Sequence, residues 1–457
     1  MRLKKAIEII FILGLFFLPF NEYEGISILG EYKSEAAALF FVSAFVLICF
    51  YSYHTNKIFL PYKNKIFIIL LLFLAFCFIS IILNLYDIVG FRFKQTSGIV
   101  RFLRQYFSTI LSTLIFFQVY WFVLKDKTIK EIILLIRKVF FISFLFVSFY
   151  GFIETLISYF GFSFLKPILD FFNYLPFIEV NYHVEGRISS VSYEPPFLAI
   201  YLITIAGWMF SYVLTSKSNY RYIPTLLVLQ LTFFSGSRTA LIVITLQFVI
   251  FLSYLYKYYG YKERILSLLK YSFVIFFSLG IFAGIKFHKA IEEKVESLDF
   301  IGNIKSNVSN RSRLGIQYTS LLIFAKNPVF GVGFGQQAYV ARALYPGWVK
   351  NNNYEFEIFY NNQWEKSFPP GYNLYTRLLA EVGIVGFLIF VYLQILMLKE
   401  ARRLSKFQNK DFQILGIILF VSTIGLFINW MQIDTFRIYG VWISLAILIK
   451  TSAYKHE

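Results

Sequence analysis

Residues 66–86 have the sequence IFIILLLFLAFCFISIILNLY, in which no side chain is charged. A helix rises about 1.5 Å per residue, and crossing the hydrocarbon core of a bilayer takes about 20 apolar residues. This segment therefore predicts a transmembrane helix, and it sets the class of fold expected for the rest of the chain.

The same pattern recurs along the chain, which is 58% hydrophobic and has a mean hydropathy of +0.63. Other windows without charge are 36–56, 105–124, 195–216 and 412–433. Spans that are shorter or carry a charge near one end are 6–21, 139–158, 222–236, 238–256, 271–287, 373–398 and 438–450. We predict an all-α polytopic membrane protein with about 12 transmembrane helices, because runs this long lack the alternation of a membrane β-barrel. No small-residue cleavage site follows the first span, which predicts a retained helix.

Lysine and arginine residues indicate the orientation in the membrane. They cluster at both termini and in the segments near 57–65, 125–138, 217–221, 257–270 and 399–410. The positive-inside rule places these segments and both termini in the cytoplasm. The net charge of +18 then reflects topology and contact with anionic membrane lipids, and no nucleic-acid partner is expected.

The spans divide the chain into three predicted regions. Residues 1–287 hold about nine helices and an outer segment near 159–194, residues 288–372 form a large periplasmic loop, and residues 373–457 hold about three helices. Within the loop, an apolar periodic stretch at 314–325 predicts an amphipathic helix on the membrane surface that ends at Asn327-Pro328. The glycines of 331–335 predict a turn.

The residue composition gives little support for a metal site or a cofactor. Cys49 and Cys77 lie in apolar spans, the four histidines lack the spacing of a metal-binding pair, and no Asp-x-Asp occurs. We therefore expect no metal and no cofactor.

A first polar motif runs from Arg187 to Glu194 and continues into Pro195-Pro196. Proline suits the first turn of a helix, so a helix is expected to begin there. Glu194 then has two interpretations. It caps the helix, or it is held at the membrane edge as the base that accepts a proton from a sugar hydroxyl.

Three further arginines lie at predicted outer ends of spans. Arg238 stands in Ser-Gly-Ser-Arg-Thr-Ala (235–240), between apolar segments where a charge costs about 3 kcal/mol. Arg313 stands in Asn-Arg-Ser-Arg (310–313), and Arg437 follows Asp434, its simplest ion-pair partner. Each arginine could be solvated or could snorkel to the headgroups, or several could converge on one anion, since arginine grips phosphate oxygens in pairs.

A last motif is Tyr372-Asn373, nine residues, then Gly383-Ile-Val-Gly386. Taken in order with the Arg187–Glu194-Pro, Ser-Gly-Ser-Arg238 and Asn327-Pro-x-x-Gly-x-Gly motifs, it resembles the bacterial O-antigen ligase/polymerase superfamily over roughly 180–390. The ligases carry a His before the Asn, and here Tyr372 takes that place. The departure favours the branch of Wzy-type O-antigen polymerases.

The resemblance implies a GT-C-like membrane glycosyltransferase of lipopolysaccharide biosynthesis in the bacterial inner membrane. It would join undecaprenyl-diphosphate-linked repeat units on the periplasmic face, beside a flippase and a chain-length regulator. By resemblance Arg187 and Arg238 bind the diphosphate, and the convergence of outer arginines adds Arg313 and Arg437. A ligase acting on lipid A core stays open as an alternative. A transporter is also open, although no repeat relates the two halves.

Candidates for base and glycan contacts complete the expected site. Glu194 is the first candidate for the base, Tyr372 is next, and Glu381 and Asp434 are weaker. Asn373, Trp348 and Trp364 are predicted to contact the glycan, because aromatic faces stack on sugar rings and amides bond hydroxyls. The other interpretation is a loop that packs on itself and dips into the headgroups.

Overall fold

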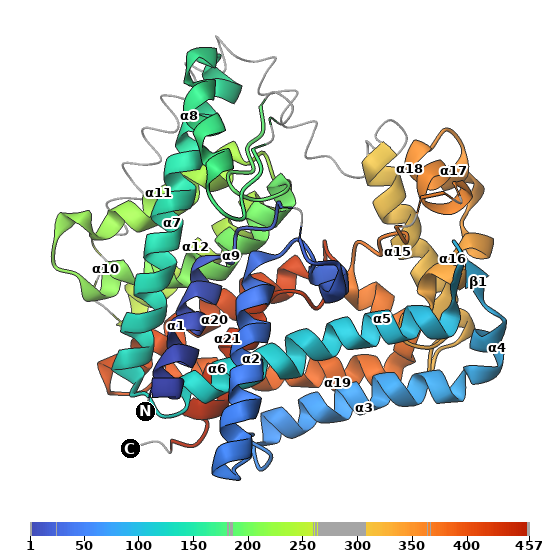
Figure 1. The fold of residues 1–457 in the computed structure, drawn as a ribbon, viewed down its shortest axis with the longest axis horizontal. Coiled ribbons are helices and arrows are strands. Elements are labelled where there is room, and N and C mark those ends of the chain that lie inside the picture. Colours follow the sequence, from blue (N-terminus) through green and yellow to red (C-terminus); the bar gives the residue numbers. More distant parts are fainter. Residues whose placement is uncertain are drawn as a thin grey trace. The chain divides into compact units, whose positions relative to one another are not determined.

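The computed structural model describes residues 2–23, 25–180, 182, 186–258, 260, 263, 308–362, 364–365 and 367–454. Nearly all regular structure in this part of the chain is helical (Figure 1). Its strands are β1 (Arg92–Phe93) and β2 (Thr96–Ser97), an antiparallel pair in which Arg92 faces Ser97 and Phe93 faces Thr96. The predicted all-α polytopic membrane protein is confirmed.

The helices of the described residues follow in chain order. They are α1 (Arg2–Phe16), η1 (Ser27–Tyr32), α2 (Ala36–Thr55), α3 (Lys65–Leu83), α4 (Leu85–Gly90), α5 (Gly98–Ile110), η2 (Leu111–Phe116), α6 (Phe117–Leu124), α7 (Ile129–Phe160), η3 (Ser163–Leu165), α8 (Lys166–Asp170), η4 (Phe171–Tyr174), α9 (Pro195–Phe210), α10 (Tyr212–Thr215), η5 (Asn219–Tyr222), α11 (Ile223–Phe234), α12 (Arg238–Tyr258), α15 (Val308–Lys326), α16 (Gln337–Leu344), α17 (Gly347–Lys350), α18 (Tyr354–Phe356), η7 (Glu357–Asn361), α19 (Leu374–Leu404), α20 (Lys410–Asn429) and α21 (Tyr439–Thr451). Among the η elements, η2 and η7 are π-helical and the others are 3₁₀.

Eight helical segments in the described part of the chain are long and apolar enough to cross a membrane. They are α2, α3, Gly98–Leu124, α7, Pro195–Thr215, α12, α19 and α20. The spans predicted at 6–21, 222–236 and 438–450 are helices α1, α11 and α21, of 15, 12 and 13 residues. At about 1.5 Å per residue, each is shorter than the roughly 30 Å hydrocarbon core. The span predicted at 271–287 lies outside the described residues.

The chain divides into two compact units. Unit 1 comprises Met1–Phe78, Leu103–Phe248 and Leu388–Glu457, and unit 2 comprises Ile79–Phe102 and Val249–Phe387. The boundaries fall within α3, α5, α12 and α19, so the units are defined by packing and not by linkers.

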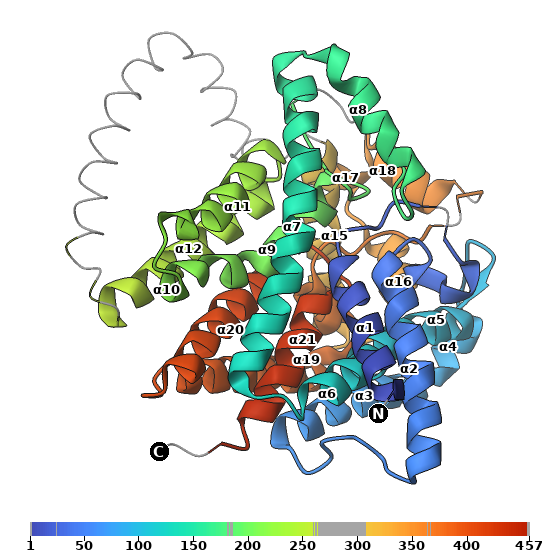
Figure 2. The same cartoon turned by 60° about the vertical axis from the view of Figure 1, so that its left-hand side comes forward.

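Unit 1 is a bundle in which α1 packs on α2, α9 on α20 and α21 on α6 (Figures 1 and 2). Its largest fully buried side chains are Trp208, Trp430 and Trp442. After α7 the chain turns back, and α8 packs on α7 (Figure 2). In η4, which follows α8, the ring centroid of Phe172 lies 5.0 Å from that of Tyr150 in α7. This bundle positions the segment 186–194 and the start of α12.

Unit 2 is organised around α15, which packs on α16, α17 and α18. The helix expected at 314–325 is present, and it ends at Lys326, directly before Asn327-Pro328, as predicted. One face of α15 is buried, including Ile316 and Ile323, and it contributes to a core with Val349 and Tyr360. Ile316 and Ile323 of α15 are therefore covered within unit 2, whereas Tyr318 and Leu321 of the same helix stay exposed.

Candidate functional site

The Ser-Gly-Ser-Arg motif forms the turn between α11 and α12. Ser235 follows the last residue of α11, and Gly236 has φ +63°, a conformation that side chains with a Cβ adopt only at a cost. The Ser237 hydroxyl accepts the N–H of Ala240 at 3.3 Å, so Ser237 caps the helix that Arg238 begins. The motif thus ends α11 and begins α12, and it places the half-buried Arg238 in the first turn of α12.

Arg187 packs against this turn. A Cβ on Gly236 would lie 3.0 Å from Arg187 Cγ and 3.5 Å from its Nε. The Tyr159 hydroxyl, at the end of α7, lies 2.5 Å from the Gly186 carbonyl and 2.9 Å from the Phe234 carbonyl, either of which can accept its hydrogen. Two of the predicted diphosphate residues are therefore brought to one corner of unit 1.

A buried carboxylate holds the segment after Arg187. Glu154 of α7 accepts the N–H groups of Ser189 and Ser190, at 3.1 and 2.7 Å, and its residue is 3% exposed. Glu154 was not among the residues predicted from the sequence. The one signal in the sequence is that Glu154 places a carboxylate inside the apolar span 139–158. An ionisable residue within such a span indicates a specific role.

The chemistry of this corner suits an anion. Arg187 is exposed, Arg238 is half-buried, and the first N–H groups of α12 lie beside them. Guanidinium groups and the N-terminus of a helix both favour phosphate oxygens. We name the residues Arg187 and 235–238 the arginine corner.

Glu194 is the residue before α9, which begins at Pro195 as predicted. Its backbone is extended, and its side chain makes no capping hydrogen bond to the helix. The preceding N–H, of Tyr193, donates to Asn21 Oδ1 at 2.7 Å. Of the two interpretations of Glu194, the side-chain cap is not realised, and the exposed carboxylate stays a candidate base.

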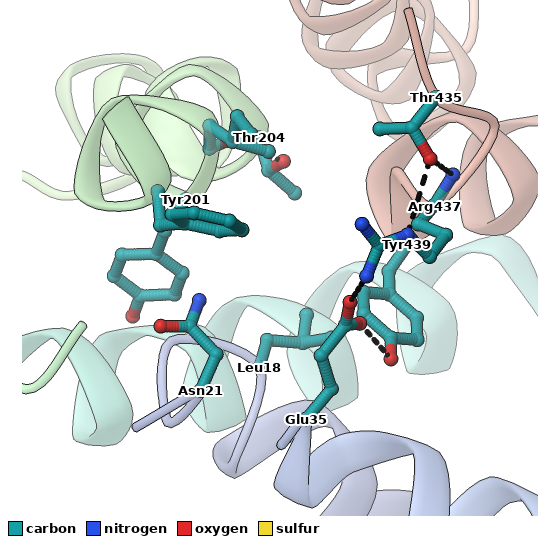
Figure 3. A pocket seen from close by; sticks show the side chains of 10 residues that line it. Leu18, Asn21, Glu35, Tyr201, Thr204, Thr435, Arg437 and Tyr439 are labelled. Atoms are coloured by element: carbon teal, nitrogen blue, oxygen red, sulfur yellow. Dashed lines mark hydrogen bonds and ion pairs between the residues drawn. The ribbon is translucent and has the colours of Figure 1, made fainter. Parts of the chain in front are cut away.

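Arg437 lines a different site in unit 1, a cavity of about 50 Å³ (Figure 3). Its Nη1 donates to Glu35 Oε1 at 2.8 Å and its Nε to Thr435 Oγ1 at 3.2 Å, while the Tyr439 hydroxyl donates to Glu35 Oε2 at 2.6 Å. A second carboxylate oxygen, Glu31 Oε2, lies 3.9 Å from Arg437 Nε. The cavity is also lined by Leu18, Asn21, Phe197, Ile200, Tyr201 and Thr204.

These contacts correct the partner expected for Arg437. Asp434, its neighbour in sequence, was the simplest partner, but the structure pairs Arg437 with Glu35, the residue before α2. Burial raises the pKa of the Glu35 carboxyl, and Arg437 opposes that shift. The positive charge of Arg437 is balanced inside this cluster, which weakens its case as a diphosphate ligand.

Tyr372 and Arg313 meet in unit 2. The Arg313 guanidinium lies 5.0 Å from the centroid of the Tyr372 ring, and the Tyr372 hydroxyl donates to Glu355 Oε2 at 3.4 Å. Tyr372 has φ +54°, an unusual value for a residue with a Cβ. The cavity beside it measures only about 10 Å³. Glu355 was not selected from the sequence, because nothing local distinguishes it from the other acids of the loop.

Asn373 caps α19. Its Oδ1 accepts the N–H groups of Tyr375 and Thr376, at 2.9 and 3.2 Å, and its Nδ2 donates to Gln317 at 3.3 Å. Its residue is 6% exposed. This capping geometry explains why the motif needs a short side chain with an oxygen acceptor at this position.

The two glycine motifs interlock. Gly383 interrupts the helical geometry of α19 with φ +62°, and a Cβ there would lie 2.3 Å from the Val329 carbonyl oxygen. Across this contact the N–H of Ile384 donates to Pro328 O at 2.8 Å and the N–H of Gly333 donates to Glu381 O at 2.8 Å. The Asn-Pro-x-x-Gly-x-Gly and Gly-x-x-Gly motifs therefore form one joint, which explains their presence in the same chain.

Glu381, a weaker candidate for the base, lies in that joint. Its Oε1 is 3.1 Å from Arg377 Nε, and both side chains are buried. The same oxygen lies 3.4 Å from the N–H of Gln337. A carboxylate buried under an arginine in this way is placed to stabilise the joint and is poorly placed to reach a sugar hydroxyl.

The two predicted tryptophans are exposed, Trp348 by 46% and Trp364 by 87%. Trp348 lies on α17 and Trp364 follows η7. Both present an aromatic face without burying it in the core of unit 2, so a role in glycan contact stays a prediction.

The structure is thus that of a polytopic helical membrane protein. It has an arginine corner in unit 1 and, in unit 2, a joint formed by the two glycine motifs. Residues 223–391 match the family model Wzy_C, described as O-antigen ligase. This part of the chain is therefore similar to the O-antigen ligase family, and the apolar helices of the described residues are those of a multi-pass membrane protein. The matched region includes Arg238, Arg313 and Tyr372. No curated protein matches the chain.

Proposed function

We propose that the protein is an O-antigen polymerase, which joins undecaprenyl-diphosphate-linked repeat units on the periplasmic face of the bacterial inner membrane. The packing of Arg187 on the turn that begins α12 carries this proposal. It unites two arginines, far apart in sequence, at the start of an apolar helix, which suits a lipid-bound diphosphate.

The chemistry follows from the leaving group. The acceptor hydroxyl oxygen forms a bond to the anomeric carbon, and the bond from that carbon to the lipid diphosphate breaks. Negative charge builds on the departing diphosphate, and the arginine corner stabilises it as it develops. The hydroxyl proton passes to a base, for which the exposed carboxylate of Glu194 is the first candidate.

Tyr372 favours a polymerase over a ligase. A tyrosine has an unperturbed pKa of about 10 and is a poor base near neutral pH. Its ring lies under Arg313 and its hydroxyl points to Glu355, an arrangement that supports the protein around it. A ligase that transfers glycan to lipid A core is the second candidate, favoured by the description of the matching family.

The proposed topology and partners complete this function. The termini are cytoplasmic, and the segments near 159–194 and 288–372 are periplasmic. Membrane lipids surround the spans, and a flippase and a chain-length regulator act beside the enzyme. Cysteine labelling from the periplasm should modify a cysteine placed at Trp348 and spare one placed at Lys127; the reverse pattern would overturn the topology.

Deleting the gene and profiling the cell's glycans tests the function. A polymerase defect leaves a single repeat unit on lipid A core, whereas a ligase defect leaves none. Complementation with Glu194→Gln, which keeps the shape of the side chain and removes its basicity, should restore less than about 1% of the chain extension, within the range of a lost general base. Lys326→Gln, which alters an exposed cation at the end of α15, is the matched control. A deletion strain without any capped core would reject the polymerase in favour of the ligase.

A further inference from the structure

Unit 2 contains a cavity of about 200 Å³ that none of the predicted site residues line. Its walls are the hairpin residues 92–95, Arg342 in the last turn of α16, and Tyr360 and Asn362 at the end of η7. By comparison, the cavity beside Tyr372 measures about 10 Å³. A single water needs about 10–15 Å³ of such accessible volume, so the larger cavity has room for a group of about the size of one sugar.

The hairpin that forms one wall is firmly placed. Lys94 and Gln95, at its tip, have φ +47° and +57°, the conformation of a tight two-residue turn. The Tyr339 hydroxyl donates to Thr96 O at 3.0 Å, and the Tyr339 ring stacks on Phe91 at 5.3 Å. Residues with a Cβ are strained at positive φ, and such strain concentrates at binding sites.

Three cations, Arg92, Lys94 and Arg342, line this cavity. Arg92 Nη1 donates to the carbonyls of Val89 and Phe91, and Lys94 Nζ donates to Ser367 O at 2.7 Å. The Arg342 guanidinium lies 5.8 Å from the Phe93 ring centroid. Among the described residues no carboxylate forms an ion pair with any of the three. Burial lowers the pKa of the Lys94 ammonium, and the negative charge of Glu365 acts against this shift.

A cavity lined by three cations favours an anion. The remaining lining groups narrow its chemistry, because the amides of Gln95 and Asn362 suit hydroxyl groups and the Phe93 ring suits the apolar face of a sugar. Inorganic phosphate would use the cations but would leave the amides and the ring without a role.

We propose that this pocket binds the carboxylate of an acidic sugar residue in the glycan chain, with Arg92, Lys94 and Arg342 as its anion ligands. The inference rests on the proposed function, since it takes a glycan as substrate. It adds a specificity-determining subsite to that function, one that holds a charged sugar of the repeat unit.

Binding to the purified full-length protein in detergent tests the subsite without any polymerase activity. Saturation-transfer NMR would compare sodium glucuronate, glucose and inorganic phosphate as probes. We expect glucuronate to bind, glucose to bind at least tenfold more weakly, and both Arg92→Gln and Arg342→Gln to weaken glucuronate binding about tenfold. Lys326→Gln, an exposed cation of the same unit outside the cavity, should leave binding unchanged. Thermal unfolding of each variant would establish that it is folded.

Several outcomes would overturn the subsite. They are glucuronate binding that the two arginine variants leave intact, no glucuronate binding to the folded parent protein, or phosphate that binds more tightly than glucuronate. Sugar analysis of the native repeat unit is an independent check, because a repeat without any acidic sugar would also reject the proposal. None of these results depends on whether the enzyme is a polymerase or a ligase.

Discussion

Two regions of unit 1 present arginines that the sequence analysis assigned to the same role, yet their surroundings differ. In the arginine corner, Arg187 is exposed and packs its aliphatic part on Gly236. In the cluster of Figure 3, Arg437 is paired with Glu35 and lies near Glu31. A guanidinium already balanced by carboxylates binds a further anion poorly, so the first region is suited to the diphosphate and the second to holding helices together.

The largest effect expected from this contrast concerns Arg238. Arg238→Ala should reduce chain extension at least 100-fold, the loss seen when a group that stabilises transition-state charge is removed. Arg238→Lys should rescue poorly, because lysine keeps the charge and loses the planar fork. The glycan ladder at matched expression measures both. Normal polymerisation by Arg238→Lys with mild impairment of Arg238→Ala would show that Arg238 merely snorkels to the headgroups.

Gly236→Ala should have the next largest effect, a loss of about tenfold in chain extension. The new Cβ would displace Arg187, whose Cγ lies 3.0 Å from its position, and the positive φ adds about 1 kcal/mol of strain. Gly347→Ala, where a Cβ meets nothing within 4 Å, is the matched control for a glycine substitution. If Gly236→Ala is fully active, the position of Arg187 on the turn is irrelevant to the reaction.

Arg437→Ala should affect stability more than chemistry. It leaves Glu35 poorly compensated and should cost about 2 kcal/mol, less than the roughly 3–5 kcal/mol of a fully buried pair, because water still reaches the guanidinium. Thermal unfolding in detergent measures the loss, and Glu35→Gln combined with Arg437→Gln should recover part of it. A variant that is stable but inactive would instead move Arg437 into the diphosphate site.

The smallest effect is expected at Tyr372. Tyr372→Phe keeps the ring under Arg313 and loses only the long 3.4 Å contact to Glu355, so chain extension should stay within about twofold of the parent. Tyr372→Ala should cost more through lost packing. The same glycan ladder would compare both with Glu194→Gln. An inactive Tyr372→Phe beside an active Glu194→Gln would reverse the assignment of the base and favour a ligase-like mechanism.

Local patterns were enough to place several elements of the site. Pro195 begins α9, α15 ends before Asn327-Pro328, and Ser237 caps α12 after a glycine turn. Each depends on chemistry within a few residues, such as the missing N–H of proline or the hydroxyl of a capping serine. Long apolar windows predicted the membrane fold for the same reason, and the short windows at 6–21, 222–236 and 438–450 correspond to the short helices α1, α11 and α21.

Contacts between distant segments were beyond the reach of the sequence. Glu154 holds Ser189 and Ser190, Glu35 pairs with Arg437, and the three cations of the hairpin cavity come from two separate stretches of unit 2. In each case the partners are tens to hundreds of residues apart, and nothing in either local pattern specifies the other. Composition likewise cannot say whether an arginine will meet a carboxylate.

The sequence by itself determined that this chain is a helical membrane protein, where its glycine and proline breaks fall, and which superfamily its motifs resemble. Hydrophobicity and backbone restrictions act over short stretches of chain, so their effects can be predicted from the sequence alone. Only the tertiary structure decided which carboxylate an arginine meets, as Arg437 meets Glu35. Charge compensation depends on distance in space, and packing of the bundle sets that distance.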